Sequence, residues 1–544
     1  MRCRRSTLLA RYAFAGAALL ATLVIAGCDG RPAHAPSRPV VLISGSENKS
    51  LFPIVTEFAE ERGVEIEIRS LGSVDIMLDI QRGVAAEADI VWPAASLWLA
   101  LGDTDGVVRH DVSIMRSPVV FWVARSRAEA LGWATPGAEI PMAEIVAAVG
   151  DGLSFGMTSA TQSNSGAMAY LAMLSAAAGA PPVITREHIA DPQVKARVSE
   201  LLDEIDRTSG SSGWLGDLYL QHPGAMAAMF NYEAVGIEVN RALEARGGEP
   251  LCAVYPADGL AIADSPLAYL DKGATEDDAK IEAFYLELRD HLLSDPVQAE
   301  LAAAGRRIGP MGMSAELLDQ AVFRTDWCLD IGRSLPVITL PEADVIEAAL
   351  RVYQSETRRP SEIVFLLDYS GSMKGEGAAQ MIAAMQTLLV PDKARGVYLE
   401  TTPEDVFHAV AFSAFSMDIG TASGGSPEAL AALFDRIAQR QPGGGTEIYN
   451  ATMRGLEILN GSPRAETHSR MAVLLTDGQS DGDFSGLQEL LSPEPSRNIP
   501  VFAVLFGAAS EAQVAEIAEA TAARVFDGRK GLIGAFRQAR GYAN

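Results

Sequence analysis

Basic residues and histidines are scarce in this chain. Its 544 residues include 44 Lys and Arg against 70 Asp and Glu, and the formal net charge is −26. Because phosphate backbones are held chiefly by Lys and Arg patches, we expect no nucleic acid partner. The seven histidines lie in no visible nucleophile or metal arrangement, and no Gly-x-Ser-x-Gly, His-Glu-x-x-His or phosphate-binding P-loop motif occurs. These absences favour a binding protein over an enzyme.

Cysteine is also rare, and two of the four cysteines lie in the first 28 residues. Four arginines near the N-terminus precede an apolar segment, 13–25, which is too short and too rich in Ala for a membrane span. Ile25-Ala26-Gly27-Cys28 follows directly. This arrangement resembles a bacterial lipoprotein signal peptide that is cleaved before Cys28. An uncleaved anchor helix is the alternative.

The resemblance implies a signal peptide at 1–27 and a lipidated tether at 28–39, whose second half is polar and rich in Pro. Acyl chains on Cys28, palmitate among them, would hold the mature protein at the bacterial cell membrane, because more than one chain is needed for stable anchoring. The protein would then face the periplasm or the exterior. The inner and the outer membrane both stay open.

Cys252 and Cys328 are then the only thiols of the mature chain. In an oxidising compartment they could pair, and closing a loop of this length would contribute about 4–5 kcal/mol in the chain-entropy model. Two buried free thiols are the alternative, because the sequence does not give the distance between them.

An oxygen-rich loop follows the apolar run 363–367, where the sequence continues Asp368-Tyr369-Ser370-Gly371-Ser372-Met373. Alternate residues of an extended segment project to the same side, so Asp368, Ser370 and Ser372 can converge at the carboxyl end of a strand. Oxygen ligands without His or Cys suit a hard divalent cation, Mg²⁺ or else Mn²⁺ or Ca²⁺.

Two later segments extend this pattern. Gly443-Gly444-Gly445-Thr446 precedes a helical pattern, and the apolar strand 471–475 ends in Thr476-Asp477-Gly478. The pieces together resemble the metal-ion-dependent adhesion site (MIDAS) of the von Willebrand factor type A family. The resemblance implies that the three hydroxyl residues bind the metal directly, that the two acids act largely through water, and that a carboxylate of a protein partner fills an open position. The candidate metal-binding residues are Asp368, Ser370, Ser372, Thr446 and Asp477.

Strand and helix patterns alternate from 361 to 544. The apolar runs are 363–367, 406–412, 471–475 and 501–506, and the helical patterns are 376–390, 427–439, 448–459 and 510–522. This βα alternation predicts a doubly wound, Rossmann-like parallel sheet. We therefore expect a von Willebrand factor type A domain at 361–544.

The region 40–330 also predicts an α/β fold. A buried strand at 40–43, an amphipathic helix at 51–61 and a second strand at 64–69 open it. Later segments occur in the order seen in two-lobed, type II periplasmic solute-binding proteins, which this region resembles; they are 88–96, 117–124, 228–233, 254–259 and 305–307.

A solute cleft is expected where strands meet helices in this region. Junctions rich in Gly and Ser present backbone N–H groups at positive helix ends, and helix capping is the alternative for each residue. The acids Glu47 and Asp75, with Lys49 as the one basic residue of the cleft segments, favour a neutral or cationic solute over a highly charged oxyanion. The candidate solute-binding residues are Ser44, Ser46, Asn48, Ser73, Ser163, Ser165 and Tyr232.

Residues 331–360 connect the two domains. They contain three prolines around a helical stretch, 342–354, with one apolar face. We expect this helix to dock on a lobe and 355–360 to act as a hinge.

The sequence therefore predicts a membrane-anchored extracytoplasmic binding lipoprotein with a cleft for an unknown small solute and a metal-dependent site for an unknown protein partner. One alternative is the solute-binding component of an ABC importer with an accessory adhesion domain. Another is an assembly or stress-response factor whose first domain binds a peptide or protein. The last is a metal-dependent hydrolase, although no general base is evident.

Overall fold

The structure is a computed structural model that describes residues 35–273, 275–309, 318–329, 331–332, 336–477, 480, 482–507 and 511–541. The predicted signal peptide, Cys28 and the first part of the tether lie outside these residues. Within the described part of the chain, no helix is both long enough and apolar enough to cross a membrane.

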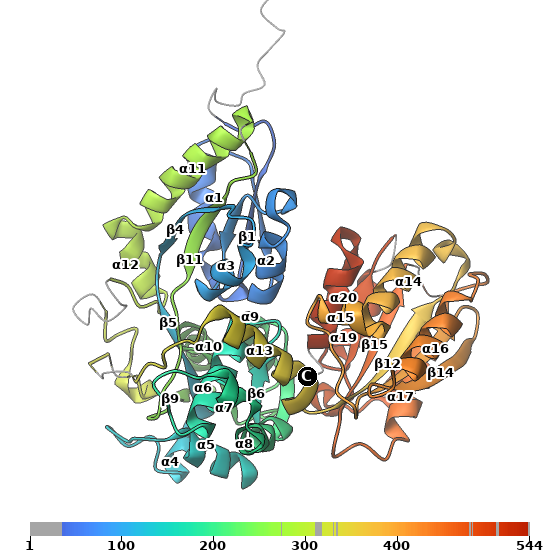
Figure 1. The fold of residues 1–544 in the computed structure, drawn as a ribbon. Helices are drawn as coiled ribbons and strands as arrows, with labels where there is room; N and C mark the ends of the chain where they lie inside the picture. Colours follow the sequence, from blue (N-terminus) through green and yellow to red (C-terminus); the bar gives the residue numbers. More distant parts are fainter. Residues whose placement is uncertain are drawn as a thin grey trace, which may run out of the picture.

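Lobe 1 is a five-stranded sheet with the order β2-β1-β3-β11-β4 (Figure 1). β1 pairs in parallel with both neighbours, and β11 is antiparallel to β3 and β4. The strands are β1 (Val40–Ser44), β2 (Ile66–Ser70), β3 (Ile90–Trp92), β4 (Val108–Ser113) and β11 (Pro266–Leu270). The helices are η1 (Ser46–Leu51), α1 (Phe52–Glu61), α2 (Ser73–Ile80), α3 (Leu97–Gly102), α11 (Glu276–Leu292) and α12 (Asp295–Ala303).

Lobe 2 has the sheet order β10-β5-β8-β6-β7, with β9 also paired to β5. Its helix α6 is buried from Asn164 to Ser175, which explains why its sequence is apolar all round. The strands are β5 (Ser117–Ala124), β6 (Phe155–Thr158), β7 (Ile205–Ser209), β8 (Ala228–Tyr232), β9 (Leu251–Val254) and β10 (Ile262–Ala263). The helices are α4 (Arg125–Ala130), α5 (Met142–Gly150), α6 (Asn164–Ala177), α7 (Arg186–Ala190), α8 (Pro192–Asp203), α9 (Ser212–Gln221) and α10 (Glu233–Ala245).

The chain crosses between the lobes from β4 to β5 and returns from β10 to β11. The two crossings lie side by side, since the backbone N–H of Ile114 donates to the carbonyl of Ser265 at 3.2 Å. Arg116 in the first crossing also pairs its backbone with Arg307, which follows α12. The chain thus passes between the lobes through two crossings that are bonded to each other.

The C-terminal domain is a six-stranded sheet with the order β14-β13-β12-β15-β16-β17. All neighbours are parallel except β14, an antiparallel edge strand. The strands are β12 (Ser361–Asp368), β13 (Val406–Phe412), β14 (Ser416–Ser423), β15 (Ser469–Thr476), β16 (Val501–Leu505) and β17 (Val525–Asp527). The helices are α14 (Glu376–Leu389), α15 (Pro391–Arg395), α16 (Pro427–Ala438), α17 (Ile448–Asn460), α18 (Ser485–Leu490), α19 (Glu511–Glu519) and α20 (Leu532–Gly541).

Side chains of the central strand β12 alternate between two apolar cores, one on each face of the sheet. Ile363, Phe365 and Leu367 pack in one core, and Val364 and Leu366 pack in the other. This burial on both faces explains the continuous apolar run in the sequence. The predicted doubly wound α/β fold is confirmed, whereas β14, β17 and α20 had not been predicted.

The connecting segment forms helix α13 (Ala343–Val352), which continues into a π-helical turn, Tyr353–Thr357. It docks on lobe 2, where Tyr353 packs against Tyr170 with ring centroids 5.1 Å apart. The expected hinge at 355–360 is wrong, because Thr357 and Arg358 are 1% and 2% exposed. Buried polar contacts therefore fix the segment that joins the two domains.

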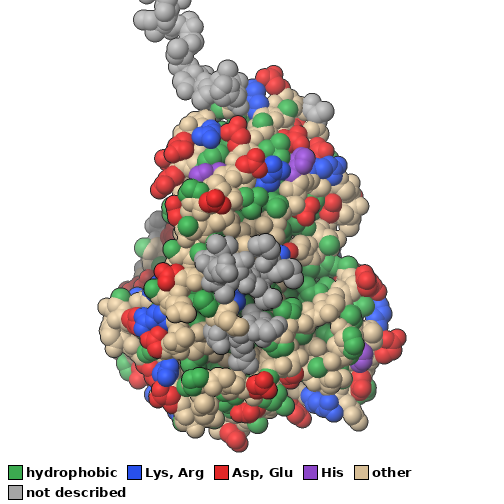
Figure 2. Space-filling model, turned by 90° about the vertical axis from the view of Figure 1, so that its left-hand side faces the viewer, with side chains coloured by type: hydrophobic (Ala, Val, Ile, Leu, Met, Phe, Trp, Pro, Cys, Tyr) green, Lys and Arg blue, Asp and Glu red, His purple; other side chains and the backbone are tan. Residues whose placement is uncertain are grey.

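Acidic side chains are spread over the surface of both lobes. On the face in Figure 2, Asp and Glu side chains lie among polar and apolar ones, with Lys and Arg between them. On this face the acids therefore form a mixed, solvated surface and no single acidic patch.

Candidate metal and solute sites

The five candidate metal residues lie on three loops at one edge of the C-terminal sheet. Asp368 ends β12, Asp477 follows β15, and Thr446 precedes α17. β12 and β15 are parallel neighbours, so their carboxyl ends bring the two acids to the same edge. The third loop is held there by its backbone, because Gly371 N–H donates to the carbonyl of Gly444 at 3.0 Å.

Hydrogen bonds connect four of these five residues, all except Thr446, through side-chain or backbone groups. The Ser370 and Ser372 hydroxyls are 2.9 Å apart, and Ser372 Oγ donates to Asp477 Oδ1 at 2.8 Å. The Asp368 carboxylate accepts from the backbone N–H of Ser370 at 2.7 Å and from the Thr476 hydroxyl at 2.6 Å. Asp368 therefore orders the loop that carries the two serines.

The chemistry of this donor set fits a hard divalent cation. Hydroxyl and carboxylate oxygens are the ligands of Mg²⁺, Mn²⁺ and Ca²⁺. Burial raises the pKa of Asp368, and the nearby charge of Asp477 adds to this rise. Ser372 is exposed, which leaves the site open to solvent. In the described part of the chain, no three His, Cys, Asp or Glu side chains form a metal cluster, and this set has only two acids.

A small cavity lies between the lobes, beside the two crossings. Its volume is about 20 Å³, enough for about one water molecule. Asn48 and Tyr232, both predicted, line it together with residues that had not been proposed as ligands: Glu47, Ala94, Met115, Arg116, Ser117, Ala234, Ala263, Ser265 and Arg306. The expectation that Lys49 is the one basic residue among the cleft segments is wrong, since Arg116 and Arg306 line the cavity.

Most of the other solute candidates bond to protein groups instead. Ser44 Oγ accepts from Asn48 Nδ2 at 3.2 Å, and Ser73 Oγ accepts from the Ala94 N–H at 3.4 Å. Ser46 Oγ accepts across the lobes from Ser211 Oγ at 2.7 Å. These serines order the loops around the cleft and are not on the cavity wall.

Ser163 and Ser165 form a buried hydroxyl cluster in lobe 2. Ser212 Oγ is 3.0 Å from Ser163 Oγ and 2.8 Å from Ser165 Oγ, and Thr158 Oγ1 is 2.8 Å from Ser165 Oγ. All four residues are less than 5% exposed. Glu233, next to the predicted Tyr232, forms a buried ion pair with Arg307 at 2.7 Å.

Helix α20 of the C-terminal domain contacts both lobes. Its Arg537 donates through Nε to Asp75 Oδ1 of lobe 1 at 2.9 Å and through Nη1 to the carbonyl of Thr161 in lobe 2 at 3.1 Å. Gln162 of lobe 2 donates back to the Arg537 carbonyl. Figure 1 shows α20 on the side of its domain that faces the lobes. Sequence reasoning missed Arg537 because no pattern marked α20.

The lobes themselves touch at this place. The backbone N–H of Val74 donates to the carbonyl of Gln162 at 3.3 Å, and a Cβ at Gly72 would come within 2.3 Å of the same carbonyl. Glycine at 72 therefore permits the close approach of the two lobes.

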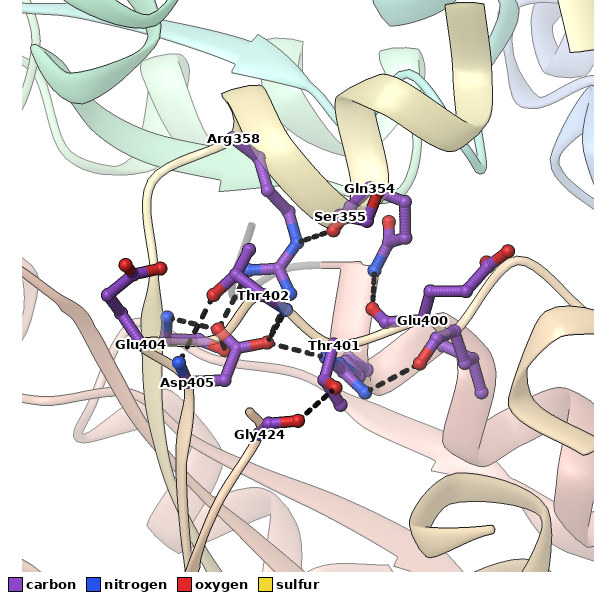
Figure 3. A network of polar contacts seen from close by, with 12 residues as sticks. Gln354, Ser355, Arg358, Glu400, Thr401, Thr402, Glu404, Asp405 and Gly424 are labelled. Atoms are coloured by element: carbon purple, nitrogen blue, oxygen red, sulfur yellow. Dashed lines mark hydrogen bonds and ion pairs between the residues drawn. The ribbon is translucent and has the colours of Figure 1, made fainter. Parts of the chain in front are cut away.

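A second buried network fixes the connecting segment to the C-terminal domain (Figure 3). Asp405 accepts from Arg358 Nη2 at 2.5 Å and from Arg540 Nη2 at 3.3 Å. Burial alone would raise the pKa of Asp405, but the charges of Arg358 and Arg540 outweigh it and lower the pKa to about 2. Gln354 bonds to the carbonyl of Glu400 at 3.0 Å.

Cys252 and Cys328 are joined by a disulfide, with Cα atoms 5.1 Å apart. Cys252 lies on β9, and Cys328 follows the 3₁₀ turn Thr325–Trp327. The bond attaches the segment after α12 to the sheet of lobe 2.

Two family models match the chain in separate regions. The model described as bacterial extracellular solute-binding protein matches residues 40–307, and the model of the von Willebrand factor type A domain matches 362–530. The first match agrees with a location outside the cytoplasm and with a small solute as ligand.

Individual relatives cover only parts of the chain. Inter-alpha-trypsin inhibitor heavy chain H1 of Bos taurus is 30% identical over 122 residues, which are 22% of this chain and 12% of the relative. The ferric binding protein from Campylobacter jejuni is 14% identical with a TM-score of 0.40, covering 58% of this chain and 98% of that one. A von Willebrand factor type A protein from Catenulispora acidiphila is 20% identical with a TM-score of 0.29, covering 34% and 43%.

Proposed function

We propose that this chain, which joins a bacterial extracellular solute-binding domain to a von Willebrand factor type A domain, is a membrane-anchored binding protein that recognises a small solute and a second protein. The lipid on Cys28 provides the anchor. The cleft between the lobes binds the solute, and the C-terminal domain captures its partner through a divalent cation. Neither domain carries out catalysis.

The observation that carries the proposal is the meeting of Ser370, Ser372 and Asp477 at one sheet edge, with hydroxyl and carboxylate oxygens 2.8 and 2.9 Å apart. Mg²⁺ bound there, with Asp368 and Thr446 completing the set, would supply a Lewis-acidic point for a partner's carboxylate. The exposed Ser372 leaves that carboxylate a direct approach. Asp368 keeps the serine loop in place through its bonds to the Ser370 N–H and to Thr476.

The test compares the wild type with a variant that carries both Asp368→Ala and Ser370→Ala. Mg²⁺ and Mn²⁺ binding is measured by calorimetry, and partner capture is measured in Mg²⁺ and in EDTA. We expect the variant to lose metal binding and Mg²⁺-dependent capture while its solute binding stays intact. Capture that survives both EDTA and the double substitution would exclude the metal-dependent mechanism.

The second candidate function is the solute-binding component of an ABC importer. The match of residues 40–307 to the solute-binding family supports it. The C-terminal domain contacts both lobes through Arg537. A domain in this position would restrict the docking of the lobes on a permease. Genes for a permease and an ATPase beside the gene for this chain would favour import, and their absence would favour recognition.

A further inference from the structure

Three buried oxygen atoms around the cavity between the lobes have no hydrogen-bond partner among the described residues. They are Glu47 Oε1, Asn48 Oδ1 and Ser265 Oγ, and all three residues line the cavity. Buried polar atoms without a partner are rare in native proteins, because each loses its bonds to water without replacement. Three at one cavity indicate a ligand that supplies hydrogen-bond donors.

The surrounding contacts direct these acceptors to the cavity. Asn48 donates its Nδ2 to Ser44 Oγ at 3.2 Å, so its carbonyl oxygen is the free end of the amide. Ser265 lies in the crossing between β10 and β11 with φ of 42°, a backbone conformation that is uncommon and costs energy for a residue other than glycine. Its N–H donates to the Ala94 carbonyl at 2.8 Å, which holds the strained position.

The charges at the cavity select among ligands. Arg306 is already occupied, since it donates to Glu238, to the Ala304 carbonyl at 2.6 Å and to the Glu47 carbonyl at 2.5 Å. An oxyanion would bring further acceptors to a place that already has three. A divalent metal ion needs about six or more oxygens, whereas only three unpartnered oxygens of the described residues line this cavity.

We propose that the cleft binds the ammonium group of a small primary amine, with its three N–H donors directed to Glu47 Oε1, Asn48 Oδ1 and Ser265 Oγ. An ammonium group has three donors and no acceptor, which matches the three free oxygens. The cavity of about 20 Å³ accepts a group of the size of one water molecule. Apolar wall residues, Ala94, Met115, Ala234 and Ala263, leave room for a short aliphatic body once the lobes part.

This inference rests on the proposed solute-binding function and names the chemistry of its ligand. The test is calorimetry at pH 8 on the mature chain with methylammonium, ammonium, tetramethylammonium, potassium and acetate as probes. Methylammonium is expected to bind. Tetramethylammonium, which has no N–H, and acetate are expected not to bind. Glu47→Gln and Ser265→Ala should each weaken methylammonium binding at least tenfold, whereas Thr56→Ala, whose hydroxyl bonds within α1 to the Phe52 carbonyl at 3.0 Å, should leave it unchanged.

Several results would overturn the proposal. If potassium binds with the same affinity as ammonium, the site recognises positive charge and not N–H donors. Binding of acetate, or methylammonium binding that Glu47→Gln leaves intact, would show a different ligand chemistry. If no probe binds, native mass spectrometry of the purified chain decides what fails. If the chain retains a solute that is not an amine, the amine proposal is wrong and the solute-binding function still holds. If the cleft holds nothing but an ordered water, both the amine proposal and the solute-binding function are wrong.

Discussion

Arg537 of α20 and Asp75 of α2 form an ion pair across 462 residues of sequence, with side chains 2% and 11% exposed. The pair joins the C-terminal domain to lobe 1, and the same guanidinium bonds to Thr161 of lobe 2. One arginine of the C-terminal domain thus bridges the two lobes of the solute-binding domain at a place where they touch.

Arg537→Ala should loosen this docking, because it leaves Asp75 buried without its cation, at a cost of about 3–5 kcal/mol. We expect a larger radius of gyration in small-angle X-ray scattering and faster proteolysis of the connecting segment. The matched control is Arg529→Ala, which removes an exposed arginine that pairs with Asp527 of its own domain. An unchanged scattering profile for Arg537→Ala would mean that other contacts hold the domains together.

Mg²⁺ should stabilise the C-terminal domain through the predicted metal site. A ligand that binds only the folded state at 100 times its Kd adds about 2.7 kcal/mol. We expect Mg²⁺ to raise the melting temperature of the wild type and of Thr387→Ala, whose hydroxyl bonds only within its own helix to Ala383. Ser372→Ala should abolish that rise. The same Mg²⁺ effect in all three proteins would place the metal elsewhere.

The loops that carry the predicted metal residues could be found from the sequence because each follows a local signal. Asp368 and Asp477 end apolar runs, and the run before Asp368 is buried on both faces of the sheet. In contrast, Arg537 and Asp75 become neighbours only when the domains dock, so no local pattern connects them. Ser265 was missed because its positive φ comes from the paired crossings, and a serine does not reveal this in the sequence.

The predicted cleft serines show a similar limit. A junction rich in Gly and Ser predicts a strand-to-helix turn. The sequence pattern is the same whether the hydroxyls of the turn face a ligand or each other. The Ser163 and Ser165 hydroxyls lie within hydrogen-bond distance of the hydroxyl of Ser212, the first residue of α9. Their role in ordering these loops depends on the packing of lobe 2, which spacing along the chain does not specify.

Glu47 should make stability depend on pH. Burial raises its pKa to about 7, against the opposing effects of a backbone hydrogen bond and Arg306. Between pH 4.5 and pH 7 the folded chain keeps this proton and the unfolded chain releases it, so stability falls as pH rises. Glu47→Gln should therefore stabilise the protein by about 3 kcal/mol at pH 8 and have little effect at pH 4.

Urea denaturation at both pH values measures this difference. Arg116, Tyr232 and Arg306 line the same cavity and are unchanged in the variant. Glu57→Gln, at an exposed position of α1, is the control and should show the same small effect at either pH. A Glu47→Gln variant that is no more stable than the wild type at pH 8 would show that the carboxylate is well solvated.

The disulfide should contribute to the stability of lobe 2. Replacing Cys252 and Cys328 by Ser removes the cross-link, and the loss expected for a native disulfide is about 2–5 kcal/mol. Urea denaturation should give the same loss for the wild type in a reducing agent, while the double variant should not respond to that agent. A wild type that is equally stable when reduced would mean that packing alone holds the segment to β9.

Asp405 should protect the docked connecting segment down to low pH. Its pKa of about 2 lies below the ordinary value near 3.8, because Arg358 and Arg540 outweigh the effect of burial. The resulting stability, about 2 kcal/mol, is complete above pH 4 and is lost as pH falls towards 2. Asp405→Asn removes this dependence and leaves two buried guanidiniums without a carboxylate, so we expect a loss of about 3–5 kcal/mol at pH 7.

The two effects can be separated by urea denaturation at pH 7, 4 and 2.5. Asp392→Asn, at an exposed position of α15, should follow the wild type at every pH. The wild type should lose more stability between pH 4 and pH 2.5 than Asp405→Asn does, because only the wild type has the carboxylate to protonate. If both proteins lose the same unfolding free energy between pH 4 and pH 2.5, other carboxylates cause the acid sensitivity. Asp405 would then stabilise the segment through packing and not through its charge.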